Sequence, residues 1–158
     1  MPSCVYRTGL DIDDMVLSIL ANAEATLSNR QKELGVCLIN IGGNTTSLIV
    51  YEEGDVIHTA VLPIGSDHIT SDIAIGLRIS IELAEKIKLE YGSALPEEIN
   101  KKEEIDLRDF GEEDKTMVSK KYIAEIIEAR VEEIFEKCDK ELKKIGRSGL
   151  LPGGVVLT

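Results

Sequence analysis

The stretch "LINIGGNTTSLIV" constrains the fold more than any other part of this chain. Apolar β segments at 36–41 and 46–52 flank its glycine turn, and a third segment at 55–64 follows them. The second and third segments are joined by Glu53-Gly54, a dipeptide typical of tight hairpins. The pattern therefore predicts an antiparallel β meander rich in Val, Ile and Thr.

Helical periodicity replaces the β pattern after this meander. The first predicted helix begins at a polar cap, Ser66 or Asp67. Its apolar residues recur at a spacing of four, at Ile69, Ile73 and Leu77. A second helix is expected after Ser80 as N-cap, with Gly92 just past its end. The apolar face of that helix is predicted to consist of Leu83, Ile87 and Tyr91.

The longest helix is predicted from the cap Ser119 to about Lys144, with Gly146 after it. At a rise of 1.5 Å per residue it is roughly 40 Å long. Its buried seam is expected at Ile123, Ile127, Val131, Ile134, Cys138, Leu142 and Ile145. The charged region 96–114 before it is interpreted as a solvated loop or edge, within which "EEIDLRDF" alternates like an edge strand.

Upstream of the meander the signals are shorter. Residues 1–10 resemble a helix end closed by Gly9, and "DDMVLSIL" at 13–20 reads as a short strand. Helix formers then predict a helix over 21–34 that stops at Gly35. At the other end, "GLLPGGVVLT" finishes in an apolar strand, which needs neighbours on its ladder and faces. We therefore expect a piece of a larger protein.

Composition excludes several classes of function. The formal net charge is -11, so nucleic acid and anionic lipid would be repelled. Charged residues near the N-terminus argue against a signal peptide. The longest uncharged run, 36–51, contains a glycine turn, which is unsuited to a membrane helix. Cys4, Cys37 and Cys138 show no metal-binding spacing and are interpreted as reduced, mostly core-filling cysteines.

The glycine turn is a candidate phosphate-binding element. Gly42 and Gly43 let a backbone approach phosphate closely, and their N–H groups are expected to form an anion nest. Thr45 and Thr46 can add hydroxyl donors. The alternative is a hairpin turn that needs glycine only for its φ angles.

An ordered series of motifs carries a resemblance to a known family. The run "NIGGNTTSLIVYEEGDVIHTAVLPIGSDHITSDIAIGL", together with "AEATLSNRQKELG", "AEKIKLEYG" and "AEIIEAR", resembles the bacterial cell-division protein family FtsA. That family is actin-like, so the resemblance implies an α/β (mixed α+β) fragment of an actin-like, ribonuclease H-like ATPase fold with two lobes around a nucleotide cleft. The likeness covers nearly the whole chain.

The resemblance also implies how the chain is divided. Residues 1–35 would end the first lobe, and 36–65 would form the opening β meander of the second lobe with its phosphate-type turn. Residues 66–146 would form a small α/β subdomain with a long helix, and 147–158 a truncated return strand to the second lobe.

Nucleotide-binding residues follow from the same resemblance. The turn residues Asn40, Gly42, Gly43, Asn44, Thr45 and Thr46 would lie at the phosphates of ATP. Glu85 and Lys88 share one helix face and resemble the E-x-x-K helix that holds ribose and adenine in the superfamily. A surface ion pair on a charged helix is the alternative for these two.

Acidic residues of the family cleft are missing here. The family aspartate at position 40, which would hold hydrated Mg²⁺, is Asn40, and Ser47 replaces a second acid. Asn44 replaces a turn glycine, and Ser18-Ile19 stand where the family usually has Glu-Pro. We therefore expect hydrolysis to be weak or lost, and we assign no catalytic residue. ATP with Mg is expected to belong to the full-length protein, and none is expected to be bound by this fragment.

No metal site is expected elsewhere. His58 and His68 lie ten positions apart, and no further ligands cluster with them.

Partners are implied by the family as well. FtsA polymerises like actin and tethers the FtsZ ring to the inner face of the cell membrane, so the resemblance implies a cytoplasmic adaptor whose membrane contact uses segments absent here. The subdomain at 66–145 would receive the acidic, apolar C-terminal peptide of FtsZ. The alternatives are another actin-like or chaperone-like ATPase, such as a pilus-assembly protein, or an orphaned structural domain.

Two cations on the long helix are candidate partner-binding residues. Arg130 and Lys137 are seven residues apart and flank the apolar seam on one edge. Such an edge suits a peptide that carries apolar anchors and carboxylates, because arginine binds a carboxylate bidentately. The alternative is an arginine that covers the core edge and pairs with Glu133 or Glu136.

Overall fold

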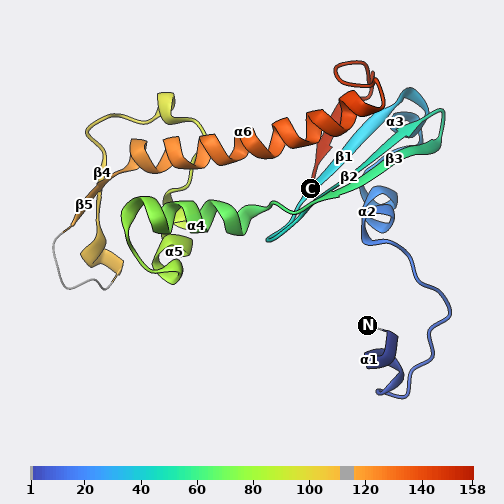
Figure 1. Ribbon diagram of the computed structural model, residues 1–158, viewed down its shortest axis with the longest axis horizontal. Helices are drawn as coiled ribbons and strands as arrows, with labels where there is room; N and C mark the ends of the chain where they lie inside the picture. The colour runs from blue at the N-terminus through green and yellow to red at the C-terminus, as the bar shows by residue number, and fades with distance from the viewer. Residues whose placement is uncertain (1, 111–115) are drawn as a thin grey trace.

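The computed structural model describes residues 2–110 and 116–158 (Figure 1). Its main sheet contains β1 (Val36–Ile41), β2 (Thr46–Glu52), β3 (Asp55–Leu62) and β6 (Val155–Leu157), in the order β3-β2-β1-β6. The first three strands are antiparallel neighbours, and β6 pairs with β1 in parallel. The predicted meander and final strand are confirmed. Glu53 and Gly54 both have positive φ, as a tight hairpin between β2 and β3 requires.

Alternating side chains give this sheet two covered faces. Residues such as Cys37, Leu48 and Val50 pack with Ile134 and Cys138 from the second half of α6 (Lys120–Lys144). The opposite face, which includes Leu38 and Ile49, is covered by α2 (Ser18–Thr26) through Ile19, Ala23 and the following Leu27. In Figure 1, α2 and α6 accordingly lie on opposite sides of the strands.

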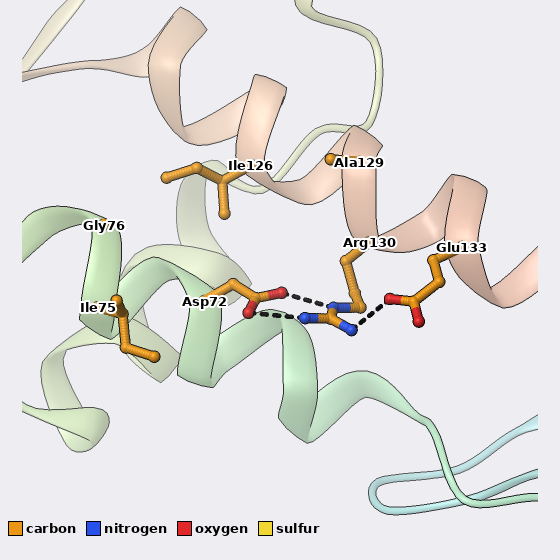
Figure 2. Close-up of a pocket in the computed structure, with 7 residues that line it drawn as sticks. All are labelled: Asp72, Ile75, Gly76, Ile126, Ala129, Arg130 and Glu133. Carbon is orange, nitrogen blue, oxygen red and sulfur yellow. Dashed lines mark hydrogen bonds and ion pairs between the residues drawn. The ribbon is translucent and has the colours of Figure 1, made fainter.

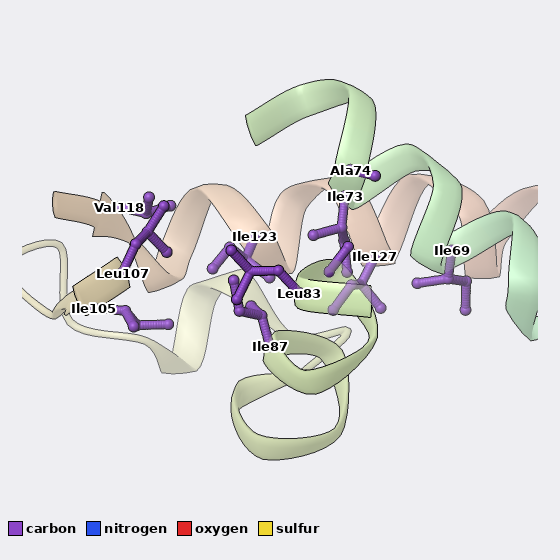
Figure 3. Packing of buried hydrophobic residues seen from close by; sticks show 11 residues of the cluster. Ile69, Ile73, Ala74, Leu83, Ile87, Ile105, Leu107, Val118, Ile123 and Ile127 are labelled. Carbon is purple, nitrogen blue, oxygen red and sulfur yellow. The ribbon is translucent and has the colours of Figure 1, made fainter. Parts of the chain in front are cut away.

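A second, smaller unit surrounds the first half of α6. It contains α4 (Ser66–Leu77), α5 (Ile81–Tyr91), the short strands β4 (Glu104–Asp106) and β5 (Met117–Ser119), and 3₁₀ turns at Pro96–Glu98 and Leu107–Phe110. Figure 3 shows its core, in which Ile73, Leu83, Ile87, Ile123 and Ile127 are buried together. The first two predicted helices are thus confirmed, and Ser80 caps α5 by accepting a hydrogen bond from the Leu83 N–H at 3.2 Å.

Helix α6 connects the two cores and is confirmed with its predicted bounds. Ser119 accepts a hydrogen bond from the Tyr122 N–H at the N-terminus. Five members of the predicted seam are buried, namely Ile123, Ile127, Ile134, Cys138 and Leu142. Val131 and Ile145 are partly buried against the same clusters. Because this seam changes partner along its length, one helix fixes the small unit relative to the sheet (Figure 1).

The sequence-based prediction was wrong for residues 13–20. They form no strand: the chain is irregular up to Leu17, and α2 begins at Ser18. A strand needs a ladder partner, and none lies beside this segment within the described part of the chain. Figure 1 shows the segment between α1 (Pro2–Tyr6) and α2 running away from the sheet.

The single helix predicted over 21–34 is also wrong. It is divided into α2 and α3 (Asn29–Leu34) because the buried Leu27 adopts an extended backbone. Ser28 then starts α3 with a capping box, in which its side chain and that of Gln31 bond to each other's backbone N–H groups.

The charged region before α6 contains less strand than its alternation indicated. Only Glu104–Asp106 forms β4, which pairs with β5, and the residues after it turn into a 3₁₀ helix. Residues 111–114 of this region lie outside the described residues. Across residues 2–110 and 116–158, none of the helices combines the length and apolar character that crossing a membrane requires.

Candidate functional site

The glycine turn between β1 and β2 is docked on the N-terminus of α4. The Gly42 N–H donates to the Thr45 carbonyl at 2.9 Å, which closes the turn. The Gly42 and Gly43 carbonyls accept hydrogen bonds from the Ser66 and Asp67 N–H groups at 2.9 and 2.8 Å. The first N–H groups of α4 are therefore satisfied by the turn and are not free to bind an anion.

The opposite side of the turn carries free donors. In a trans peptide the carbonyl and the following N–H point in opposite directions, so the Gly43 and Asn44 N–H groups point away from α4. Within residues 2–110 and 116–158 neither N–H has an acceptor. Both residues are exposed. The turn can thus offer adjacent backbone donors to a phosphate.

Glycine is needed here for close approach and not for a left-handed backbone. Neither Gly42 nor Gly43 has a positive φ, and Asn44 does not have one either. The turn therefore lacks the left-handed residue that anion nests usually contain. Gly65, which precedes α4, would place a Cβ only 2.4 Å from both the Gly42 and Gly43 carbonyl oxygens. Any side chain at position 65 would push the turn off the helix.

The two threonines of the turn differ in their surroundings. Thr46 is fully buried, and its hydroxyl donates to the Ile64 carbonyl at 2.8 Å. A hydroxyl has a single hydrogen to donate, so in this arrangement Thr46 has none left for a phosphate. Thr45 is exposed and remains accessible as a donor.

Asn40 and Ser47 lie directly opposite each other on β1 and β2. They share the sheet face of Leu38 and Ile49, on the α2 side. Both side chains are neutral, so these positions supply no charge to a metal ion. A carboxylate that the sequence reasoning missed does reach the turn: the Asp67 oxygens lie 3.0 and 3.1 Å from where a Gly43 Cβ would stand.

Glu85 and Lys88 meet the same first turn of α4. Lys88 Nζ lies 2.7 Å from Glu85 Oε2 and donates to Thr70 Oγ1 at 2.8 Å and to the Ser66 carbonyl at 3.5 Å. The Thr70 hydroxyl donates to Glu85 Oε2 at 2.5 Å. Hydrogen bonds from Lys88 and then Thr70 lower the pKa of Glu85 below its ordinary value. Ser66 thus connects the glycine turn to the Glu85–Lys88 pair.

A groove of about 410 Å³ runs beside this network between α4 and α5. Its lining includes Asp67, Thr70, Ser71, Ile81, Glu82 and Glu85. The carboxylates among them disfavour a bare phosphate and can accept hydrogen bonds from hydroxyl groups.

Arg130 occupies a different place, between α6 and α4 (Figure 2). Its guanidinium donates to both oxygens of Asp72, at 2.6 Å from Nε and 2.9 Å from Nη2, and its Nη1 donates to Glu133. Lys137 Nζ lies 3.3 Å from Glu133, so both predicted cations contact this one acid. The alternative pairing with Glu133 is observed, and the main partner, Asp72, was missed because a contact between separate helices leaves no spacing signal.

Both histidines contact other residues of the chain. His58 Nε2 lies 3.3 Å from Glu141, and His68 Nδ1 accepts a hydrogen bond from the Gly65 N–H at 3.1 Å. In the part of the chain that the structure describes, no group of His, Cys, Asp and Glu is arranged to hold a metal ion.

Solved structures with the same arrangement define the class of fold. MreB5 of Spiroplasma citri bound to ADP matches 98% of this chain and 50% of its own, with a TM-score of 0.76 and 18% identity. EutJ from Carboxydothermus hydrogenoformans matches 98% of this chain and 46% of its own, with a TM-score of 0.65 and 22% identity. The chain is therefore a portion of an actin-like, mixed α/β fold.

Sequence comparisons identify the family within that class. The model of "Cell division protein FtsA" matches residues 37–156. FtsA of Bacillus subtilis is 44% identical and FtsA of Pseudomonas aeruginosa 42% identical, each over 155 residues and 98% of this chain. The chain belongs to the FtsA cell-division protein family. It spans 35% of the length of the first of these relatives and 37% of the second.

Proposed function

We propose that this chain is the part of an FtsA-type cell-division adaptor that contains the FtsZ-docking subdomain and one side of the nucleotide cleft. The observation that carries the proposal is the FtsA family match over residues 37–156. In the whole protein, an actin-like filament would link the FtsZ ring to the inner face of the cell membrane through segments outside this chain.

The division of the chain belongs to the same proposal. Residues 1–35 are assigned to the end of the first lobe, 36–65 to the opening of the second, 66–146 to the small subdomain and 147–158 to the return strand. The pairing of β6 with β1 supports the last assignment, because it returns the chain from the subdomain to the sheet.

Peptide docking is assigned to the groove between α4 and α6. This groove has a volume of about 390 Å³, and Ile75, Ile126 and Ala129 line it next to Arg130. An apolar surface beside a guanidinium suits a peptide with an apolar anchor and a carboxylate. Lys137 is placed on the same edge of α6, one turn beyond Glu133.

Nucleotide binding is assigned to the glycine turn and the adjoining groove of α4 and α5. The free Gly43 and Asn44 N–H groups support a phosphate there, and we assign the Glu85–Lys88 pair to the ribose and base. In the full-length protein Mg-ATP would supply the charge that these donors neutralise. The neutral Asn40 and Ser47 give a metal ion little support, so hydrolysis is expected to be weak or absent.

A structural likeness alone does not favour the alternative of a pilus-assembly protein. The structure of the PilM–PilN type IV pilus biogenesis complex is similar over 87% of this chain, with a TM-score of 0.57. At 19% identity this likeness shows the fold alone.

The docking proposal is tested by titrating the chain into a fluorescently labelled synthetic peptide of the FtsZ C-terminal tail. We expect Arg130→Ala to weaken binding about tenfold or more, because a partly desolvated arginine–carboxylate bond is lost. Lys143→Ala is the matched control, since Lys143 is an exposed cation at the far end of the same helix. Lost affinity at an unchanged melting temperature supports docking. A lower melting temperature with peptide binding intact would leave Arg130 only its structural role.

A further inference from the structure

Arg130 uses three of its five guanidinium N–H groups within the chain, including the Nε–Nη2 fork. Nε and Nη2 hold both oxygens of Asp72, and Nη1 holds Glu133. Arginine recognises a carboxylate through this same bidentate geometry. The Nε–Nη2 fork, which a carboxylate from a docking peptide would use, is therefore already occupied by the Asp72 carboxylate from α4.

The pair stands at the end of an apolar groove (Figure 2). Gly76 brings α4 close to α6 there, since a Cβ at this position would lie 2.7 Å from Ile126 Cδ1. Ile75, on the rim, is 75% exposed, although isoleucine is usually buried. The groove thus presents uncovered apolar surface directly beside a neutralised arginine.

We propose that Asp72 is an internal competitor that regulates peptide docking by occupying the Arg130 fork. This inference rests on the proposed function of the groove. When an acidic peptide binds, its carboxylate replaces Asp72 at Nε and Nη2, while its apolar side chain covers Ile75 and Ile126. Asp72 then turns toward solvent.

The exposure of the pair makes this exchange feasible. The Arg130 and Asp72 side chains are 24% and 27% exposed. Ion pairs that water reaches contribute little net stability, so one carboxylate can replace another without leaving a buried charge unpaired. Displaced Asp72 and the retained Glu133 would still repel an incoming acidic peptide. The competitor thereby lowers affinity and selects peptides whose apolar anchor compensates for the exchange.

The test measures the dissociation constant of the same labelled FtsZ tail peptide for the wild-type chain and Asp72→Asn. We expect Asp72→Asn to bind about three- to tenfold more tightly, because a neutral amide competes more weakly than a carboxylate. Asp72→Glu restores a carboxylate and is expected to return the affinity toward wild type. Melting curves establish that each variant is folded.

Glu136→Gln is the matched control. It changes the net charge by the same amount as Asp72→Asn, on the helix that carries Arg130, and within the described residues Glu136 makes no bond to Arg130. Its affinity is expected to stay near wild type. Equal tightening by Glu136→Gln would overturn the inference, because net charge alone would explain the effect.

The outcomes separate the two proposals. Binding by the wild type with no gain in Asp72→Asn overturns the competitor and leaves docking intact. Binding by Asp72→Asn but not by the wild type supports the competitor strongly. If neither chain binds the peptide, both proposals are overturned, because Asp72→Asn should leave the Arg130 fork open to the peptide carboxylate.

Discussion

Gly65 fixes the candidate phosphate turn by having no side chain. Its φ of -166° is extended backbone that any residue can adopt, so conformational freedom does not explain it. The reason is steric: the Gly42 and Gly43 carbonyl oxygens would lie 2.4 Å from a Cβ. The pattern of the turn indicated its own glycines but not Gly65, because the requirement for Gly65 comes from contact with a neighbouring segment.

Gly65→Ala is therefore expected to lower the free energy of unfolding by about 1–3 kcal/mol, the usual cost of an overpacked site. Urea denaturation measures the change. Gly43→Ala is the matched control, since the nearest atoms to its Cβ would belong to the Asp67 carboxylate, which can rotate away. Equal losses in the two variants would contradict the steric explanation.

A substitution at Asn40 tests whether the turn belongs to a nucleotide cleft. Asn40→Asp in the full-length protein is expected to tighten Mg²⁺-dependent nucleotide binding, because a carboxylate restores charge to the metal shell. Calorimetry with ATP, in the presence and absence of Mg²⁺, measures the effect. Asn100→Asp, at an exposed position, controls for net charge. Unchanged affinity and metal dependence would show that Asn40 lies outside the metal position.

At the scale of elements, the predictions succeeded where sequence supplied both a pattern and a local stop signal. Ser80 and Ser119 begin helices as expected, and the Glu53-Gly54 hairpin sets the register of β2 and β3. Residues 13–20 have strand-like composition, but among the described residues no strand lies beside them, so composition alone gave a wrong prediction. The break at Leu27 depended on burial against the sheet, which local propensity does not contain.

The packing of α6 on the sheet predicts which thiols react. Cys37 on β1 and Cys138 on α6 lie in one apolar cluster, where burial raises their pKa to about 12 and about 11. The reactive thiolate is therefore rare at pH 8. We expect a disulfide reagent at pH 8 to label the exposed Cys4 quickly and the other two only after unfolding. Fast labelling of all three would contradict this packing.

The same raised pKa values set a pH dependence of stability. Burial of the protonated thiols contributes fully to the stability of the folded chain at pH values below their ordinary pKa of 9.0. That contribution is lost as the pH rises through the folded-state values, because the unfolded chain ionises first.

For the whole molecule, the family and the fold could be predicted because ordered motifs run through the chain. The candidate sites could be predicted only in part. Helical spacing placed Glu85 with Lys88 and Arg130 with Glu133, since these contacts lie within one helix. Other contacts at the same sites come from α4 across long intervals of sequence, through Thr70, Asp67 and Asp72. Only packing determines such contacts.

Peptide docking is tested most directly by mapping where the FtsZ tail peptide binds. Amide shifts of the nitrogen-15-labelled chain would be followed by NMR as the unlabelled peptide is added. Docking predicts that the largest changes fall at residues 72–76 on α4 and 126–133 on α6, around the groove beside Arg130. An absence of changes, or changes centred on the sheet at 36–62, would contradict it.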